Sequence, residues 1–129
     1  MSQRDWESYH ERFVRDPLPI RLGGVAANLA RIHSFSDHDG HCEVVHDMIE
    51  DSEFLIEWTA PVAELETQVE LLTLQRLLAR WYFTWEPIWH DLVRRRAVAK
   101  EAARWSDRLL DLSGLLNEET YDKYNIPRR

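Results

Sequence analysis

The chain is short of the residues that make turns and cross-links. Among 129 residues there are four glycines, five prolines and a single cysteine, Cys42. So few turn residues exclude a many-stranded sheet, because each reversal between strands favours glycine, proline or asparagine. A lone cysteine cannot form a disulfide within the chain, which is typical of a reducing compartment. We therefore expect a helical protein without internal disulfides, cytoplasmic by default.

Long apolar runs are missing as well. A membrane-spanning helix needs about 20 mostly apolar residues. The most apolar stretch, residues 77–93, is interrupted by Arg80, Glu86, His90 and Asp91. The first residues also lack the apolar segment of a signal peptide. With 44% hydrophobic and 30% charged residues, the composition is that of a globular protein. We expect residues 1–129 to form a single helical domain that does not contact a membrane.

Basic residues are absent from the middle of the chain. No lysine or arginine occurs between Arg31 and Arg76, and eleven acidic residues lie from Asp37 to Glu70. From Arg76 to Arg108 eight basic residues outnumber four acidic ones. The net charge of −7 argues against nucleic-acid binding. Either an acidic helix packs beside a basic one in the fold, which we favour, or each forms a separate charged face for a partner.

Apolar residues recur at helical spacing along most of the chain. This periodicity predicts an all-α protein, an antiparallel bundle of four main helices over about 17–35, 42–58, 61–83 and 85–113. A short helix over 3–14 precedes them. Gly114 is expected to be the left-handed cap residue after the last helix. The polar residues 117–129 are predicted to form a loose tail.

The third and fourth predicted helices leave an alternative open. Thr84 and Pro87 mark a new helix start, which favours a hairpin. However, the apolar stripe runs through Pro87 without losing phase, at positions 71, 74, 78, 81, 85, 88 and 92. The alternative is therefore one long helix over 61–113, kinked at Pro87 and about 80 Å long. Such a helix would require a dimer to cover its stripe. We favour the hairpin because of its ordinary helix lengths.

One stretch concentrates residue types that bind metal ions. His38, His41, Glu43 and His46 lie close together in the sequence. The spacing of Glu43 and His46 places both side chains on one side of a helix, as in carboxylate-bridged dimetal bundles. However, Glu43 falls on the polar face of its helix. We favour a solvated loop without a cofactor, and a metal-binding bundle is the alternative.

The aromatic and basic residues suggest an interaction surface. Trp81 and Trp85 fall on the apolar stripe and are expected in the core. Trp89, with Tyr82 on its flank, is the candidate for an interface, where aromatic and arginine side chains concentrate binding energy. A basic ridge adds to this surface and consists of Arg96, Lys100, Arg104 and Arg108. We expect the ridge to pair with the acidic residues of 43–57, which would account for both charged faces.

Catalytic patterns are absent from the sequence. Cys42 directly follows His41, but the sequence predicts no oxyanion hole that a catalytic cysteine would need. Gly23 and Gly24 lie inside a predicted helix rather than after a strand, so they do not form a phosphate-binding loop. We therefore expect a non-catalytic protein that acts through protein–protein contact, as a homo-oligomer, most simply a dimer. A basic-helix nucleic-acid binder is the least favoured alternative.

Three segments resemble an uncharacterised family of small all-helical proteins from bacteria such as cyanobacteria. They are residues 25–32 (VAANLARI), 54–61 (FLIEWTAP) and 105–110 (WSDRLL). The resemblance implies a helical fold. It brings no activity, cofactor or functional residue.

Overall fold

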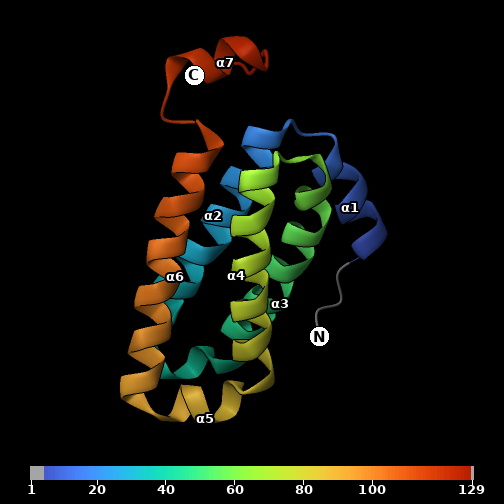
Figure 1. Ribbon diagram of the computed structural model, residues 1–129. Helices are drawn as coiled ribbons and strands as arrows, with labels where there is room; N and C mark the ends of the chain where they lie inside the picture. Colours follow the sequence, from blue (N-terminus) through green and yellow to red (C-terminus); the bar gives the residue numbers. More distant parts are fainter. Residues whose placement is uncertain (1–4, 129) are drawn as a thin grey trace.

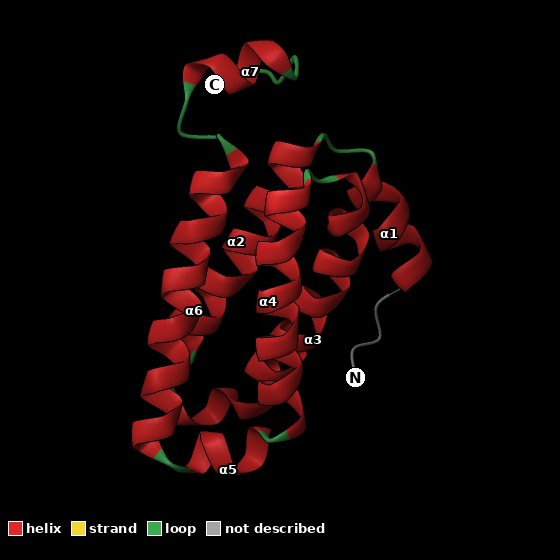
Figure 2. Ribbon diagram, viewed as in Figure 1, coloured by secondary structure: helices red, strands yellow, loops and turns green. Residues whose placement is uncertain are grey.

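Helices make up almost all of the computed structural model, which describes residues 5–128. The α-helices are α1 Trp6–Val14, α2 Leu18–Phe35, α3 Cys42–Thr59, α4 Leu65–Phe83, α5 Trp85–His90, α6 Leu92–Ser113 and α7 Glu118–Lys123. Two short 3-10 helices, η1 Asp39–His41 and η2 Ala60–Val62, precede α3 and α4. The described residues contain no strand (Figure 2). The predicted all-α class is therefore confirmed.

The four long helices α2, α3, α4 and α6 form a bundle (Figure 1). α2 packs most extensively against α6 and also against α3, and α3 packs against α4. α5 crosses one end of the bundle, and α7 lies at the other end. The core is formed by the inward apolar residues of all four helices, among them Val25, Leu29, Ile32, Val45, Ile49, Ile56, Leu71, Leu74, Leu78, Ala102 and Leu109. No helix in the described part of the chain is both long and apolar enough to cross a membrane.

The hairpin is confirmed, with a correction to its second helix. α4 and α6 run in opposite directions (Figure 1), but the predicted helix 85–113 is divided at Asp91. The Asp91 carboxylate accepts hydrogen bonds from the backbone N–H groups of Val93 at 3.1 Å and Arg94 at 3.2 Å, and so caps a new helix. Trp85 and Ile88 of α5 are buried, but Leu92, the next position of the predicted stripe beyond Asp91, is 47% exposed. The predicted apolar stripe therefore ends at the break between the two helices.

The start of the third helix also differs from the prediction. A start at Pro61 was expected, but α4 begins at Leu65. Thr59 instead belongs to α3, where its hydroxyl donates a hydrogen bond to the Leu55 carbonyl at 2.7 Å. This bond to the preceding turn satisfies the hydroxyl inside α3. Pro61 lies in η2, which connects the two helices.

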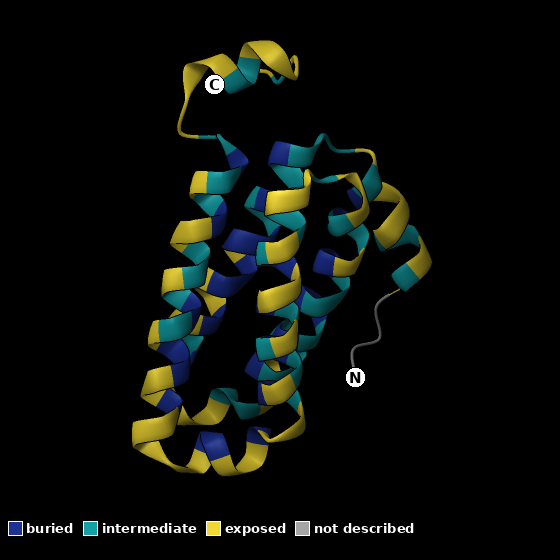
Figure 3. Cartoon of the chain, in the orientation of Figure 1, coloured by how far each residue is buried: buried dark blue, intermediate teal, exposed yellow. Residues whose placement is uncertain are grey.

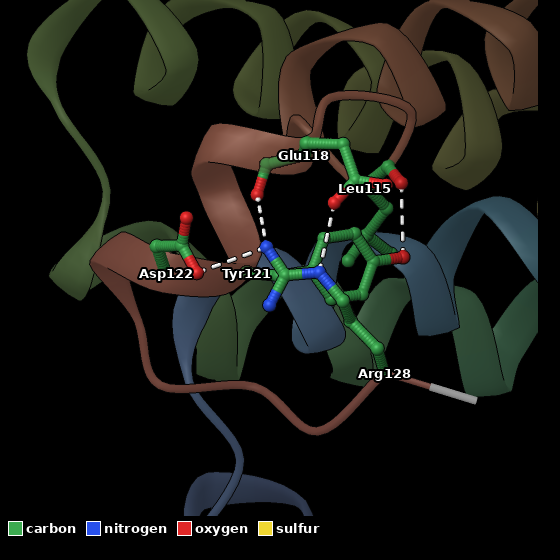
Figure 4. Close-up of polar contacts among 5 residues, drawn as sticks. All are labelled: Leu115, Glu118, Tyr121, Asp122 and Arg128. Atoms are coloured by element: carbon green, nitrogen blue, oxygen red, sulfur yellow. Dashed lines mark hydrogen bonds and ion pairs between the residues drawn. The ribbon is translucent and has the colours of Figure 1, made fainter.

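The predicted loose tail contains a helix, α7, that is held by polar contacts (Figure 4). Arg128 donates hydrogen bonds to the carboxylates of Glu118 at 2.8 Å and Asp122 at 2.9 Å. The Tyr121 hydroxyl donates to the Leu115 carbonyl at 2.9 Å. The polar residues that suggested a tail thus form bonds with one another.

Gly114 separates α6 from this C-terminal segment. Its φ of 75° lies in the left-handed region, as predicted for the residue after the helix. A Cβ atom at this position would lie 2.5 Å from the Thr120 hydroxyl oxygen. Both the backbone conformation and the close approach of α7 therefore require glycine here.

Candidate interaction surface

The expected pairing between the basic ridge and the acidic residues of α3 does not form. α2 packs against both α3 and α6 and lies between them. Arg104 pairs with Glu101 of its own helix, and Arg108 pairs with Glu70 of α4 at 2.9 Å. The Arg108 hydrogen bond lowers the pKa of Glu70. The acidic residues of α3 and the basic ridge are therefore separate, and the two charged stretches meet only through pairs such as that of Arg108 with Glu70.

Two further residues of the predicted surface make their contacts within the fold. Trp89 is only 2% exposed, and its ring packs against Trp85 with centroids 5.5 Å apart. Tyr82 is half-buried, stacks on His46 at 4.0 Å and donates a hydrogen bond to Glu50 at 3.2 Å. Trp89 therefore belongs to the core and cannot form a surface contact. The four members of the basic ridge remain exposed.

The structure does not bring the predicted metal ligands together as one set. The rings of His38 and His41 lie 4.5 Å apart, but Nδ1 of His41 lies 3.0 Å from a backbone carbonyl oxygen. Nε2 of His46 is similarly 3.0 Å from the Tyr82 carbonyl oxygen, and Glu43 is exposed. Among residues 5–128, no group of three or more His, Cys, Asp or Glu side chains could hold a metal ion.

A different surface, not predicted from the sequence, lies on the outer side of α4. We define the α4 stripe as Leu65, Val69, Leu72, Ala79 and Phe83. Its four large side chains are all exposed, from 52% at Leu72 to 83% at Phe83. The members are spaced by three, four or seven residues, so they share one side of the helix. Much of the side of α4 turned toward the viewer in Figure 3 is accordingly exposed.

The α4 stripe lies opposite the core-facing side of the same helix. Leu71, Leu74 and Leu78 are completely buried. At about 100° per residue, the centres of the two sets are separated by roughly half a turn. α4 is therefore apolar on two sides, and the bundle covers only one of them. The adjacency of Leu71 and Leu72 was the available signal, because neighbouring positions on a helix cannot share a face.

Charge is segregated along α4. The first half carries Glu66 and Glu70, and the second half carries Arg76 and Arg80. Glu70 is engaged by Arg108 of α6. Within residues 5–128, Glu66, Arg76 and Arg80 form no ion pair, and all three are exposed. The exposed surface of α4 around the stripe thus carries opposite charges at the two ends of the helix.

The acidic side of α3 carries one carboxylate whose ionisation is opposed by its surroundings. Glu53 lines a cavity of about 230 Å³ together with Phe54 and Tyr82. Burial raises the pKa of Glu53, and the negative charge of Glu50 raises it further. Burial and the same acidic neighbours also raise the pKa of Tyr82. A charge on Glu53 therefore opposes folding.

Replacing Glu53 with glutamine is expected to raise the free energy of unfolding at neutral pH. Because the pKa of Glu53 is raised in the folded chain, folding is penalised when the carboxylate is charged, and the penalty is removed as the pH falls through that pKa. The gain should therefore vanish at about pH 3, where Glu53 is protonated in both the folded and the unfolded chain. Urea unfolding at the two pH values measures this. Glu57→Gln, an exposed change on the same helix, is the control, and an equal gain at both pH values would contradict the expectation.

Comparisons with protein-family models, curated proteins and solved structures give no match to this chain.

Proposed function

We propose that this protein acts without catalysis, through protein–protein contact, and that it self-associates as a homo-oligomer by means of the α4 stripe. The observation that carries the proposal is the second apolar side of α4, opposite the core. Apolar side chains gathered on one exposed helix face are typical of an interaction site. The free thiol of Cys42 supports the expected cytoplasmic setting.

The stripe provides enough driving force for association. Burying each of its four half- to mostly exposed large side chains contributes about 1–2 kcal/mol. The eight such side chains of two copies together contribute about 8–16 kcal/mol, against the roughly 4–15 kcal/mol that association costs. We therefore expect weak, reversible self-association that increases with protein concentration.

Replacing Val69 with glutamate is expected to abolish self-association. A carboxylate at the centre of the stripe would lose its water without gaining a partner, which costs several kcal/mol. Light scattering at several concentrations measures the mass against the 15.4 kDa of one chain. Val93→Glu is the matched control, because Val93 is an exposed valine on α6, outside the stripe. A wild-type chain that remains a monomer at every concentration would overturn the proposal.

A further inference from the structure

We infer that the partner on the α4 stripe is a second copy of this chain, bound with its α4 antiparallel about a two-fold axis that crosses the stripe at the level of residue 74. This inference rests on the proposed self-association and adds the orientation, the register and the residue pairs.

The stripe has the spacing of a two-stranded helical seam. Positions 65, 69, 72, 76, 79 and 83 alternate steps of four and three, which is the repeat by which one helix packs along another. In an antiparallel pair, the two-fold axis places position n of one helix beside position 148 − n of the other. Leu65 then packs against Phe83 of the second copy, and Val69 against Ala79. The first pair joins two large side chains, and the second joins valine to the smaller alanine.

Arg76 is the polar member of this seam. It lies beside Leu72 of the second copy and is exposed in the single chain. Its long aliphatic stem can cover apolar surface while the guanidinium stays in water. One polar residue in an apolar seam reduces stability but fixes the register, because a shifted pairing would bury the charge. The seam therefore specifies one arrangement among several possible ones.

The flanking charges select the antiparallel orientation. Glu66 and Arg80 are each seven positions from Thr73 and lie on the same flank of the stripe. In an antiparallel pair this flank of one helix faces the same flank of the other, and the flank positions pair with a sum of 146, an offset of two residues, or about 3 Å, from the seam positions. Glu66 of each copy therefore meets Arg80 of the other. Both residues are exposed and without an ion pair among the described residues. A parallel pair would instead set this flank against the opposite one, which carries the uncharged Gln68 and Gln75.

The length of the contact fits a small, reversible dimer. α4 has 19 residues, so the seam is about 28 Å long. The two-fold axis repeats each of the three core pairs, which gives six layers of side chains. Such a contact is at the lower end of stable interfaces, which bury about 800 Å² on each partner. It is nevertheless self-complementary, as a two-fold contact must be.

Charge reversal on this flank tests the arrangement. Glu66→Arg and Arg80→Glu are each expected to weaken the homodimer on the order of tenfold, because every homodimer then contains two like-charge contacts. Mixing the two variants should restore wild-type affinity, because each of the two flank contacts in the mixed dimer again joins one basic and one acidic side chain. Sedimentation of the separate and mixed variants measures both effects. Arg96→Glu, an exposed reversal on α6, should leave the affinity unchanged.

The outcomes separate the orientation from the proposed function. Weaker single variants and a restored mixture support the antiparallel pair. Single variants that associate like the wild type, or a mixture no tighter than its components, overturn this arrangement and leave the self-association itself in place. If the wild type is a monomer at all concentrations, both the proposed function and this inference fail. Thermal unfolding of each variant confirms that the fold is retained.

Discussion

Replacing Leu71 with alanine is expected to lower the free energy of unfolding by about 2–5 kcal/mol. Leu71 is completely buried in the core, so the change leaves a cavity that the surrounding helices can fill only in part. At the next position, Leu72 is 52% exposed, and its replacement by alanine should cost less than about 1 kcal/mol in the single chain. Urea unfolding of both variants at low protein concentration measures the difference.

Self-association should be affected in the opposite order, with the larger loss in Leu72→Ala. Leu72→Ala removes a side chain from the α4 stripe of both copies and is expected to weaken the dimer on the order of a hundredfold. Leu71→Ala leaves the stripe intact and should associate normally under conditions where it is folded. Light scattering in the absence of denaturant measures the self-association of both variants. Equal losses of stability in the two variants would contradict the burial of only one side of α4.

Most of the architecture could be predicted because helical periodicity is a local property of the sequence. The boundaries were harder, since they depend on individual hydrogen bonds. Asp91 divides the predicted last helix by capping a new one, and Thr59 extends α3 by bonding to the preceding turn. Neither event changes the spacing of apolar residues in the sequence. The helices could therefore be located from the periodicity of the apolar residues, but the boundaries between them could be located only from the structure.

The surface could not be predicted because periodicity does not say which side of a helix its neighbours cover. Leu65, Val69 and Leu72 were assigned to the same helix as Leu71 and Leu74, but only the last two are in the core. Trp89 was an interface candidate because tryptophan suits both environments. Its burial depends on η1 and α6, whose positions no local pattern specifies.

Removing the carboxylate of Asp39 is expected to destabilise the protein by about 2 kcal/mol or more. Asp39 accepts a hydrogen bond at 2.9 Å from Arg95, whose side chain is only 10% exposed. The guanidinium lies 4.5 Å from the centre of the Trp89 ring, and its Nε has no hydrogen-bond partner among residues 5–128. In Asp39→Ala the buried charge loses the carboxylate that offsets its desolvation. Asp37→Ala, an exposed change in the same loop, is the control and should be close to neutral.

Arg95→Met is expected to cost less than Asp39→Ala, although it removes the larger and more buried side chain. Methionine keeps an apolar stem against Trp89 and removes the charge that must be desolvated. The Asp39 side chain is 91% exposed and is stable in water without a partner. Its backbone carbonyl still accepts the 3.3 Å hydrogen bond from the Trp89 ring nitrogen in both variants, so that contact does not affect the comparison. Urea unfolding gives the order of the two losses. A larger loss for Arg95→Met would mean that the contact of the guanidinium with Trp89 contributes more to stability than its ion pair with Asp39.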